Sequence, residues 1–130
     1  MTAAKPELAR PTVLVVDDYT DTRQVLRRLL EIIDCRVVEA ENGAEAIALA
    51  YLKRPNLIII DLNMPVLDGL ATVERLRALP RLEGTLIIAI TAYDVYGMRE
   101  AALEAGCTEY LAKPLDFERL GQLVRDLLTT

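Results

Sequence analysis

The 130-residue sequence has no histidine, no tryptophan and only two cysteines. Without histidine the chain lacks Ser–His and Cys–His nucleophile pairs and histidine metal ligands, and it cannot carry a phosphohistidine. Cys35 and Cys107 are too few for a disulfide framework, and we expect both to remain thiols. These absences exclude histidine-dependent hydrolases and histidine-ligated metal sites.

Basic residues and long apolar runs are also scarce. Lys and Arg number 15 against 20 Asp and Glu, a formal net charge of −5. Direct nucleic-acid binding is therefore disfavoured, because it needs a basic surface. The apolar runs are far shorter than a membrane span, and the opening residues MTAAKPELARP lack the apolar segment of a secretory signal. We expect a cytoplasmic protein without a membrane segment.

Short apolar or β-branched runs alternate with segments of helical periodicity. We expect strands at 12–16, 36–40, 57–60, 86–90 and 109–112, and helices at 20–33, 44–53, 68–79, 93–105 and 116–128. The third and fourth strands, LIII and LIIAI, are continuously apolar, which is typical of a parallel sheet covered on both faces. The second strand is more polar, which indicates a sheet edge. The fold class is α/β, built from five βα units.

The five units account for one domain. We expect residues 1–10 to be a loose tail and residues 11–130 to form the domain, with no output domain in the chain. Asp68 is the expected N-cap of the third helix, and Gly106 is expected to close the fourth.

The first expected helix, residues 20–33, has an amphipathic pattern. One face collects the residues expected to pack on the core: Thr22, Val25, Leu26, Leu29, Leu30 and Ile33. Arg23, Arg27 and Glu31 are expected to point away from that face.

Polar residues stand where the strands end. Asp17 and Asp18 follow the first strand, Asp61 the third and Thr91 the fourth, and Lys113 follows the fifth. Ligands of open parallel sheets bind beyond these carboxyl ends. Each residue alone has an ordinary interpretation, as a helix cap, a loop residue or a strand former. Capping does not explain Asp61, because the following LNMPVL is not helical. Together, these residues favour a functional site at this edge.

The chemistry of such a site follows from its residue types. Three carboxylates repel one another and need a cation, and oxygen ligands without His or Cys select Mg²⁺ or Mn²⁺. An ammonium and a hydroxyl beside the metal can bind phosphoryl oxygens. A carboxylate can also be a nucleophile and form an aspartyl phosphate. We therefore predict Asp61 as the nucleophile, and Asp17 and Asp18 as metal-holding residues.

The sequence resembles the receiver domain of two-component response regulators. The motifs that carry the resemblance are VVDD at 15–18, IIIDLNMPVLDG at 58–69, ITA at 90–92 and YLAKP at 110–114. They occur in order along residues 12–128. The resemblance implies the flavodoxin-like strand order 2-1-3-4-5. It also implies a signalling phospho-acceptor with self-catalysed phosphoryl transfer and slow autodephosphorylation, not an enzyme in the usual sense.

The resemblance assigns roles at the acidic end of the sheet. Asp61 accepts the phosphoryl group and helps to bind Mg²⁺, for which Mn²⁺ can substitute. Asp18 is a direct metal ligand, Asp17 acts through a metal-bound water, and the backbone carbonyl of Asn63 is the third protein ligand.

The resemblance also implies a switch. Lys113 pairs with Asp61 and then with the phosphoryl group, which the Thr91 hydroxyl and the Ala92 backbone also bind. Tyr110 follows Thr91 inward, which changes the face formed by the fourth helix, fifth strand and fifth helix. The Lys113–Pro114 peptide bond is expected to be cis.

Partners follow from the same resemblance. The donor is a histidine kinase or a histidine phosphotransfer protein, and the reader is an unidentified downstream protein, with a phosphorylation-dependent dimer also allowed. Neither a nucleic acid nor a membrane is an expected partner.

Asn63 and Tyr93, each two residues after a site residue, are expected to border the approach of water and tune the phosphoryl lifetime.

Three other functions fit the topology. A flavin-mononucleotide binder needs free N–H groups after the first strand, where this chain has DDYTD. An aspartyl-phosphate-forming hydrolase commonly has a second acid two residues after its nucleophile, where this chain has Asn63. A phosphorylation-independent interaction module of the same fold is the third alternative.

Overall fold

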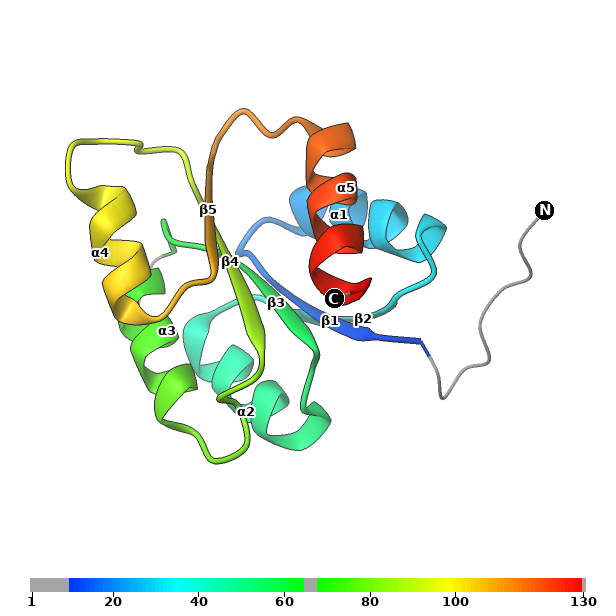
Figure 1. Ribbon diagram of the computed structural model, residues 1–130, viewed down its shortest axis with the longest axis horizontal. Coiled ribbons are helices and arrows are strands. Elements are labelled where there is room, and N and C mark those ends of the chain that lie inside the picture. The colour runs from blue at the N-terminus through cyan, green and yellow to red at the C-terminus, as the bar shows by residue number, and fades with distance from the viewer. Residues whose placement is uncertain (1–9, 65–67, 130) are drawn as a thin grey trace.

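The structure, a computed structural model, describes residues 10–64 and 68–129 (Figure 1). The strands are β1 (Thr12–Val16), β2 (Arg36–Ala40), β3 (Leu57–Asp61), β4 (Leu86–Thr91) and β5 (Glu109–Ala112). The helices are α1 (Thr20–Ile32), α2 (Gly43–Lys53), α3 (Gly69–Ala78), α4 (Met98–Ala105) and α5 (Phe117–Thr129). The expected tail, residues 1–10, lies outside the described residues except for Arg10.

The five strands form one parallel sheet in the order β2-β1-β3-β4-β5, the expected flavodoxin-like order. β2 is at an edge, as its polarity indicated, and β3 is central with all five residues buried. Helices α1 and α5 cover one face, while α2, α3 and α4 cover the other (Figure 1). This three-layer arrangement explains why β3 and β4 are apolar on both faces.

Two hydrophobic cores lie on opposite faces of the sheet, because successive strand side chains point to opposite sides. Val13, Val15 and Ile59 belong to the core under α1 and α5. Leu14 and Ile58 belong to the core under α2, α3 and α4. Each fully buried aliphatic side chain stabilises the fold by roughly 1.5–3 kcal/mol. The cores fix the strand register and therefore the positions of the residues at the strand ends.

Helix α1 differs from its expected pattern at two positions. Arg23, expected to point away from the core face, is buried, and Val25, expected on that face, is 46% exposed. The guanidinium of Arg23 is buried with polar partners in the loop after β1, on α1 and on β2, which satisfy its donors. Hydrophobic periodicity cannot identify a buried arginine of this kind.

Helix α4 begins at Met98, five residues after the expected start at residue 93. Its N-cap is Gly97, whose φ of 86° lies in the left-handed region. The side chains of Tyr93, Val95 and Tyr96, which lie within the expected range, are exposed in the β4–α4 loop. The prediction of a helix over 93–105 was wrong in its first five residues.

The other element ends lie within one residue of expectation. The N-cap role of Asp68 is confirmed, since its carboxylate accepts a 2.8 Å hydrogen bond from the Ala71 N–H, and Gly106 closes α4 as expected. Strands β3 and β4 each extend one residue further, to Asp61 and Thr91. None of the helices in the described part of the chain has the length and apolar character needed to span a bilayer.

Candidate functional site

The acidic residues converge at the carboxyl end of the sheet. Asp17 and Asp18 directly follow β1, and Asp61 is the last residue of β3, next to Ile90 on β4. Carboxylate oxygens of the three acids lie within 4.8 Å of one another. Asp17 and Asp61 are only 3% and 4% exposed, whereas Asp18 is exposed. A set of oxygen donors at this spacing fits a hard divalent cation such as Mg²⁺.

Burial has an electrostatic cost that is visible at Asp17. Desolvation raises the pKa of the Asp17 carboxyl, and the neighbouring Asp61 and Asp18 raise it further. The Tyr19 N–H, which donates to Asp17 Oδ1 at 2.8 Å, and Lys113 act in the opposite direction without cancelling the increase. Ionisation of the Asp17 carboxyl is therefore costly in the protein alone, and a bound cation would reduce that cost.

The ammonium group of Lys113 places a positive charge beside the acidic cluster. Its Nζ lies 3.1 Å from Asp61 Oδ2, while the Asn63 N–H donates to Asp61 Oδ1 at 2.8 Å. Both carboxylate oxygens of Asp61 are thus held in a fixed direction. Lys113 follows β5, and its peptide bond to Pro114 is cis, as expected.

A short hydrogen-bond chain connects β4 to the loop after β3. The Tyr93 N–H donates to Thr91 Oγ1 at 3.0 Å. The Thr91 hydroxyl in turn donates to Asn63 Oδ1 at 2.8 Å, and the Ala92 N–H donates to the same oxygen at 2.8 Å. Thr91 is fully buried, and it lies next to Ala112 of β5. The hydroxyl thus has one defined direction, toward the acidic end of the sheet.

Tyr110 of β5, which was expected to take part in a switch, is buried in the structure. Its side chain is 6% exposed, and its hydroxyl donates to Asp94 Oδ1 at 2.9 Å. The Arg99 guanidinium lies 5.9 Å from the centre of the Tyr110 ring, at cation–π distance. Desolvation and the Asp94 carboxylate raise the pKa of Tyr110 to about 12. The phenol therefore stays neutral and ties β5 to the β4–α4 loop.

Arg23 belongs to the site region although sequence reasoning placed it elsewhere. Its guanidinium donates to the backbone carbonyl of Asp17 at 2.7 Å and to Thr20 Oγ1 at 3.2 Å. It also donates to Glu39 Oε1 at 3.0 Å, and Arg27 donates to the second oxygen of Glu39 at 2.7 Å. The one sequence signal for this network is a glutamate within β2, a strand otherwise suited to packing under α1.

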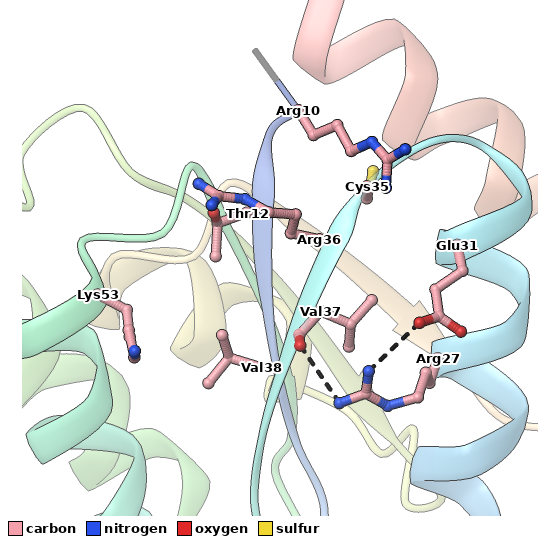
Figure 2. A pocket seen from close by; sticks show the side chains of 9 residues that line it. All are labelled: Arg10, Thr12, Arg27, Glu31, Cys35, Arg36, Val37, Val38 and Lys53. Carbon is pink, nitrogen blue, oxygen red and sulfur yellow. Dashed lines mark hydrogen bonds and ion pairs between the residues drawn. The ribbon is translucent and has the colours of Figure 1, made fainter. Parts of the chain in front are cut away.

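A separate cavity of about 430 Å³ lies at the other end of the sheet (Figure 2). It is lined by Arg10, Thr12, Arg27, Glu31, Cys35, Arg36, Val37, Val38 and Lys53. In Figure 2, Arg27 points to Glu31 and to the carbonyl of Val37, and these bonds measure 3.4 and 3.2 Å. Arg10 forms an ion pair with Asp34 at 3.3 Å. Internal pairing reduces the basic character of this cavity, and the acidic cluster remains the candidate site.

The Asn63 side chain is the site feature that the sequence least anticipated. The sequence suggested a backbone ligand and a neighbour of the water path. In the structure the Asn63 side chain instead binds the Thr91 hydroxyl and the Ala92 N–H directly. A side chain in an irregular loop has no periodicity from which its direction could be predicted.

Comparison with known proteins gives consistent results. The family described as "Response regulator receiver domain" matches residues 13–125. An uncharacterised 14.6 kDa protein of Leptolyngbya boryana is 42% identical over 118 residues, 91% of this chain and 90% of that protein. The transcriptional regulatory protein PrrA of Mycobacterium tuberculosis is 41% identical over 91% of this chain but only 50% of its own length. The chain thus spans about half of that relative.

A solved structure matches as well. The receiver domain of the sensor histidine kinase PA1611 from Pseudomonas aeruginosa superposes with a TM-score of 0.85 at 31% identity. The match covers 94% of this chain and 100% of that one. That structure is described with a magnesium ion coordinated in its active-site cleft.

Proposed function

The chain belongs to the response regulator receiver domain family, and from this premise we propose that it accepts a phosphoryl group on Asp61 from a histidine kinase or a histidine phosphotransfer protein. One observation carries the proposal. The Asp61 carboxylate lies 3.1 Å from Lys113 Nζ, at the end of the central strand and beside the carboxylates of Asp17 and Asp18.

The transfer step uses groups of this chain. A carboxylate oxygen of Asp61 attacks the phosphorus, and the new O–P bond forms as the P–N bond to the donor imidazole breaks. The electron pair returns to the imidazole, which takes up a proton. Lys113 Nζ, the Thr91 hydroxyl and the Ala92 N–H are donors for the transferred oxygens, so catalysis is positioning and charge stabilisation.

Mg²⁺ fits the acidic cluster. Asp18, Asp61 and the Asn63 carbonyl would hold it, with Asp17 acting through a water, and Mn²⁺ would substitute. The ion would supply positive charge that the three carboxylates and the incoming phosphoryl group both need.

The proposed output is a change in one face of the molecule. Thr91 and Tyr110 would couple the phosphoryl group to the surface formed by α4, β5 and α5, since Tyr110 already ties β5 to the β4–α4 loop. Phosphorylation can bias this switch only through contacts that differ between its two states. The reader would be a downstream protein or a second copy of the chain.

Turnover of stable phosphate esters is not expected. The residue two after Asp61 is Asn63, which cannot act as general acid or base. Slow autodephosphorylation, with water attacking the phosphorus and the O–P bond breaking, would restore the carboxylate. Under this proposal residues 11–130 act as one receiver in the cytoplasm.

Beryllium fluoride with Mg²⁺, a phosphoryl mimic, tests the proposal in amide NMR spectra. We expect shifts that begin around Asp61 and extend through α4 and β5 to Tyr110. Asp61→Asn keeps the shape but removes the carboxylate, and it should abolish them. Asp68→Asn, a matched change at the α3 cap, should leave them intact. A full response in Asp61→Asn would show that Asp61 is not the acceptor. Shifts confined to the loops after β1 and β3 would show that the face formed by α4, β5 and α5 does not respond.

A further inference from the structure

We propose that the amide oxygen of Asn63 occupies the place of a phosphoryl oxygen in the unphosphorylated protein. It accepts the hydrogen bonds of the site's phosphoryl-binding donors until a phosphoryl group on Asp61 displaces it. The inference rests on the proposed function and adds a regulatory step to the same site. Asn63 Oδ1 accepts hydrogen bonds from the Thr91 hydroxyl and the Ala92 N–H, both at 2.8 Å. These are the two donors that the proposed function assigns to the transferred phosphoryl group.

The direction of the amide follows from the donors. A backbone N–H can only donate, so the Ala92 N–H must face the amide oxygen of Asn63 and not its NH₂ group. The Thr91 hydroxyl accepts from the Tyr93 N–H at 3.0 Å and therefore has its own proton available for the same amide oxygen. One oxygen thus receives two convergent donors, the geometry that an anionic oxygen bound at this place would also use.

The backbone of Asn63 contacts the acceptor itself. The Asn63 N–H donates to Asp61 Oδ1 at 2.8 Å, while the side chain of the same residue binds the donors on β4. Asn63 therefore bridges the carboxylate that would be phosphorylated and the groups that would bind the product. A phosphoryl group on Asp61 cannot reach Thr91 and Ala92 until the amide oxygen leaves.

The donors should stay in place when the amide is removed. Thr91 is the buried last residue of β4, next to Ala112 in the sheet, and the Tyr93 N–H holds its hydroxyl from the other side. Ala92 follows directly in the backbone. A small side chain at position 63 would therefore leave two oriented donors without a partner. A phosphoryl mimic should bind them more tightly, because it no longer competes with the amide.

The test compares Asn63→Ala with the wild type in beryllium fluoride titrations at saturating Mg²⁺, followed by the amide signals of Ala92 and Tyr110. We expect the dissociation constant to fall about tenfold, because the mimic no longer has to break two hydrogen bonds. An unchanged or weaker affinity overturns the inference. Asn42→Ala, which removes an amide at the α2 cap, is the matched control and should behave as wild type.

A second measurement needs no mimic. In the protein alone, the Ala92 amide proton should exchange with solvent faster in Asn63→Ala than in the wild type, because it loses its acceptor. Equal exchange rates would show that the Asn63 contact does not hold the donors, and would overturn the inference. A wild-type protein that ignores beryllium fluoride would overturn the proposed function and this inference together. A wild-type response with no gain in Asn63→Ala overturns this inference alone.

Discussion

Tyr93 stands beside the proposed acceptor site with its side chain 64% exposed, while its N–H binds the Thr91 hydroxyl. Because its backbone is fixed at the site, its ring can border the path of a water molecule toward Asp61. We expect Tyr93→Ala to speed loss of the phosphoryl group by about threefold, less than 1 kcal/mol in barrier height, with its Mg²⁺ dependence unchanged.

An autodephosphorylation time course measures this effect. Tyr96→Ala is the matched control, because Tyr96 is fully exposed in the same loop and lies five residues beyond Thr91. If Tyr93→Ala loses its phosphoryl group no faster than wild type, the ring does not shield the phosphorus.

Single residues of the site differed in how well the sequence predicted them. Asp61, Thr91 and Lys113 were predictable in position, because each ends or follows a strand and the ends of parallel strands meet at one edge. Arg23 was not, because a buried arginine depends on partners far away in the sequence, such as Glu39. The Asn63 side chain depends on a loop conformation that no local pattern fixes.

At the scale of elements, the β1–α1 loop carries Asp17 and Asp18, and Arg23 of α1 fastens it. Its bond to the Asp17 carbonyl joins the loop to Glu39 on β2. We expect Arg23→Met to weaken Mg²⁺ binding several-fold and to reduce the free energy of unfolding by about 1–3 kcal/mol, since a buried carbonyl and a carboxylate lose a charged donor.

Calorimetric Mg²⁺ titration and thermal unfolding in EDTA separate the two effects. Arg28→Met is the control, because Arg28 is exposed on the same helix. A variant that is less stable but binds Mg²⁺ like the wild type would give Arg23 a structural role only.

The β4–α4 connection shows where element boundaries could not be predicted. The helix was expected to begin at residue 93, yet Gly97 takes a left-handed conformation and the helix begins after it. The Asp94 carboxylate accepts the Tyr110 hydroxyl bond instead of capping a helix at residue 93. The contact to β5 is a tertiary one that no local pattern shows, whereas the buried strands were predictable from their continuous apolar runs.

At the scale of the whole molecule, the acidic cluster lowers global stability when no cation is bound. Burial and the nearby carboxylates raise the pKa of Asp17 above its ordinary value of 3.8. A raised pKa in the folded state means that folding favours the protonated Asp17 carboxyl. The stability gained in this way is fully present below pH 3.8 and is lost as the pH rises through the raised pKa. At neutral pH the ionised carboxylate therefore destabilises the fold.

We expect Asp17→Asn to unfold at a higher urea concentration than wild type at pH 7 in EDTA, with the difference shrinking as the pH is lowered toward 4. Added Mg²⁺ should stabilise the wild type more than the variant. Glu104→Gln, which changes an exposed carboxylate on α4, is the control. Equal midpoints for wild type and Asp17→Asn at pH 7 would contradict the electrostatic account.

The two cores on opposite faces of the sheet each contain one of the two cysteines. Cys35 lies in the core under α1 and α5, and Cys107 lies in the core under α2, α3 and α4. Both are buried, and burial raises the pKa of the Cys107 thiol to about 11. The two cysteines are only 3% and 7% exposed, so a thiol reagent should react much faster with each one once its own layer opens. The two cysteines are therefore native chemical probes, one for each face of the sheet, and their labelling rates report separately on the opening of each helical layer.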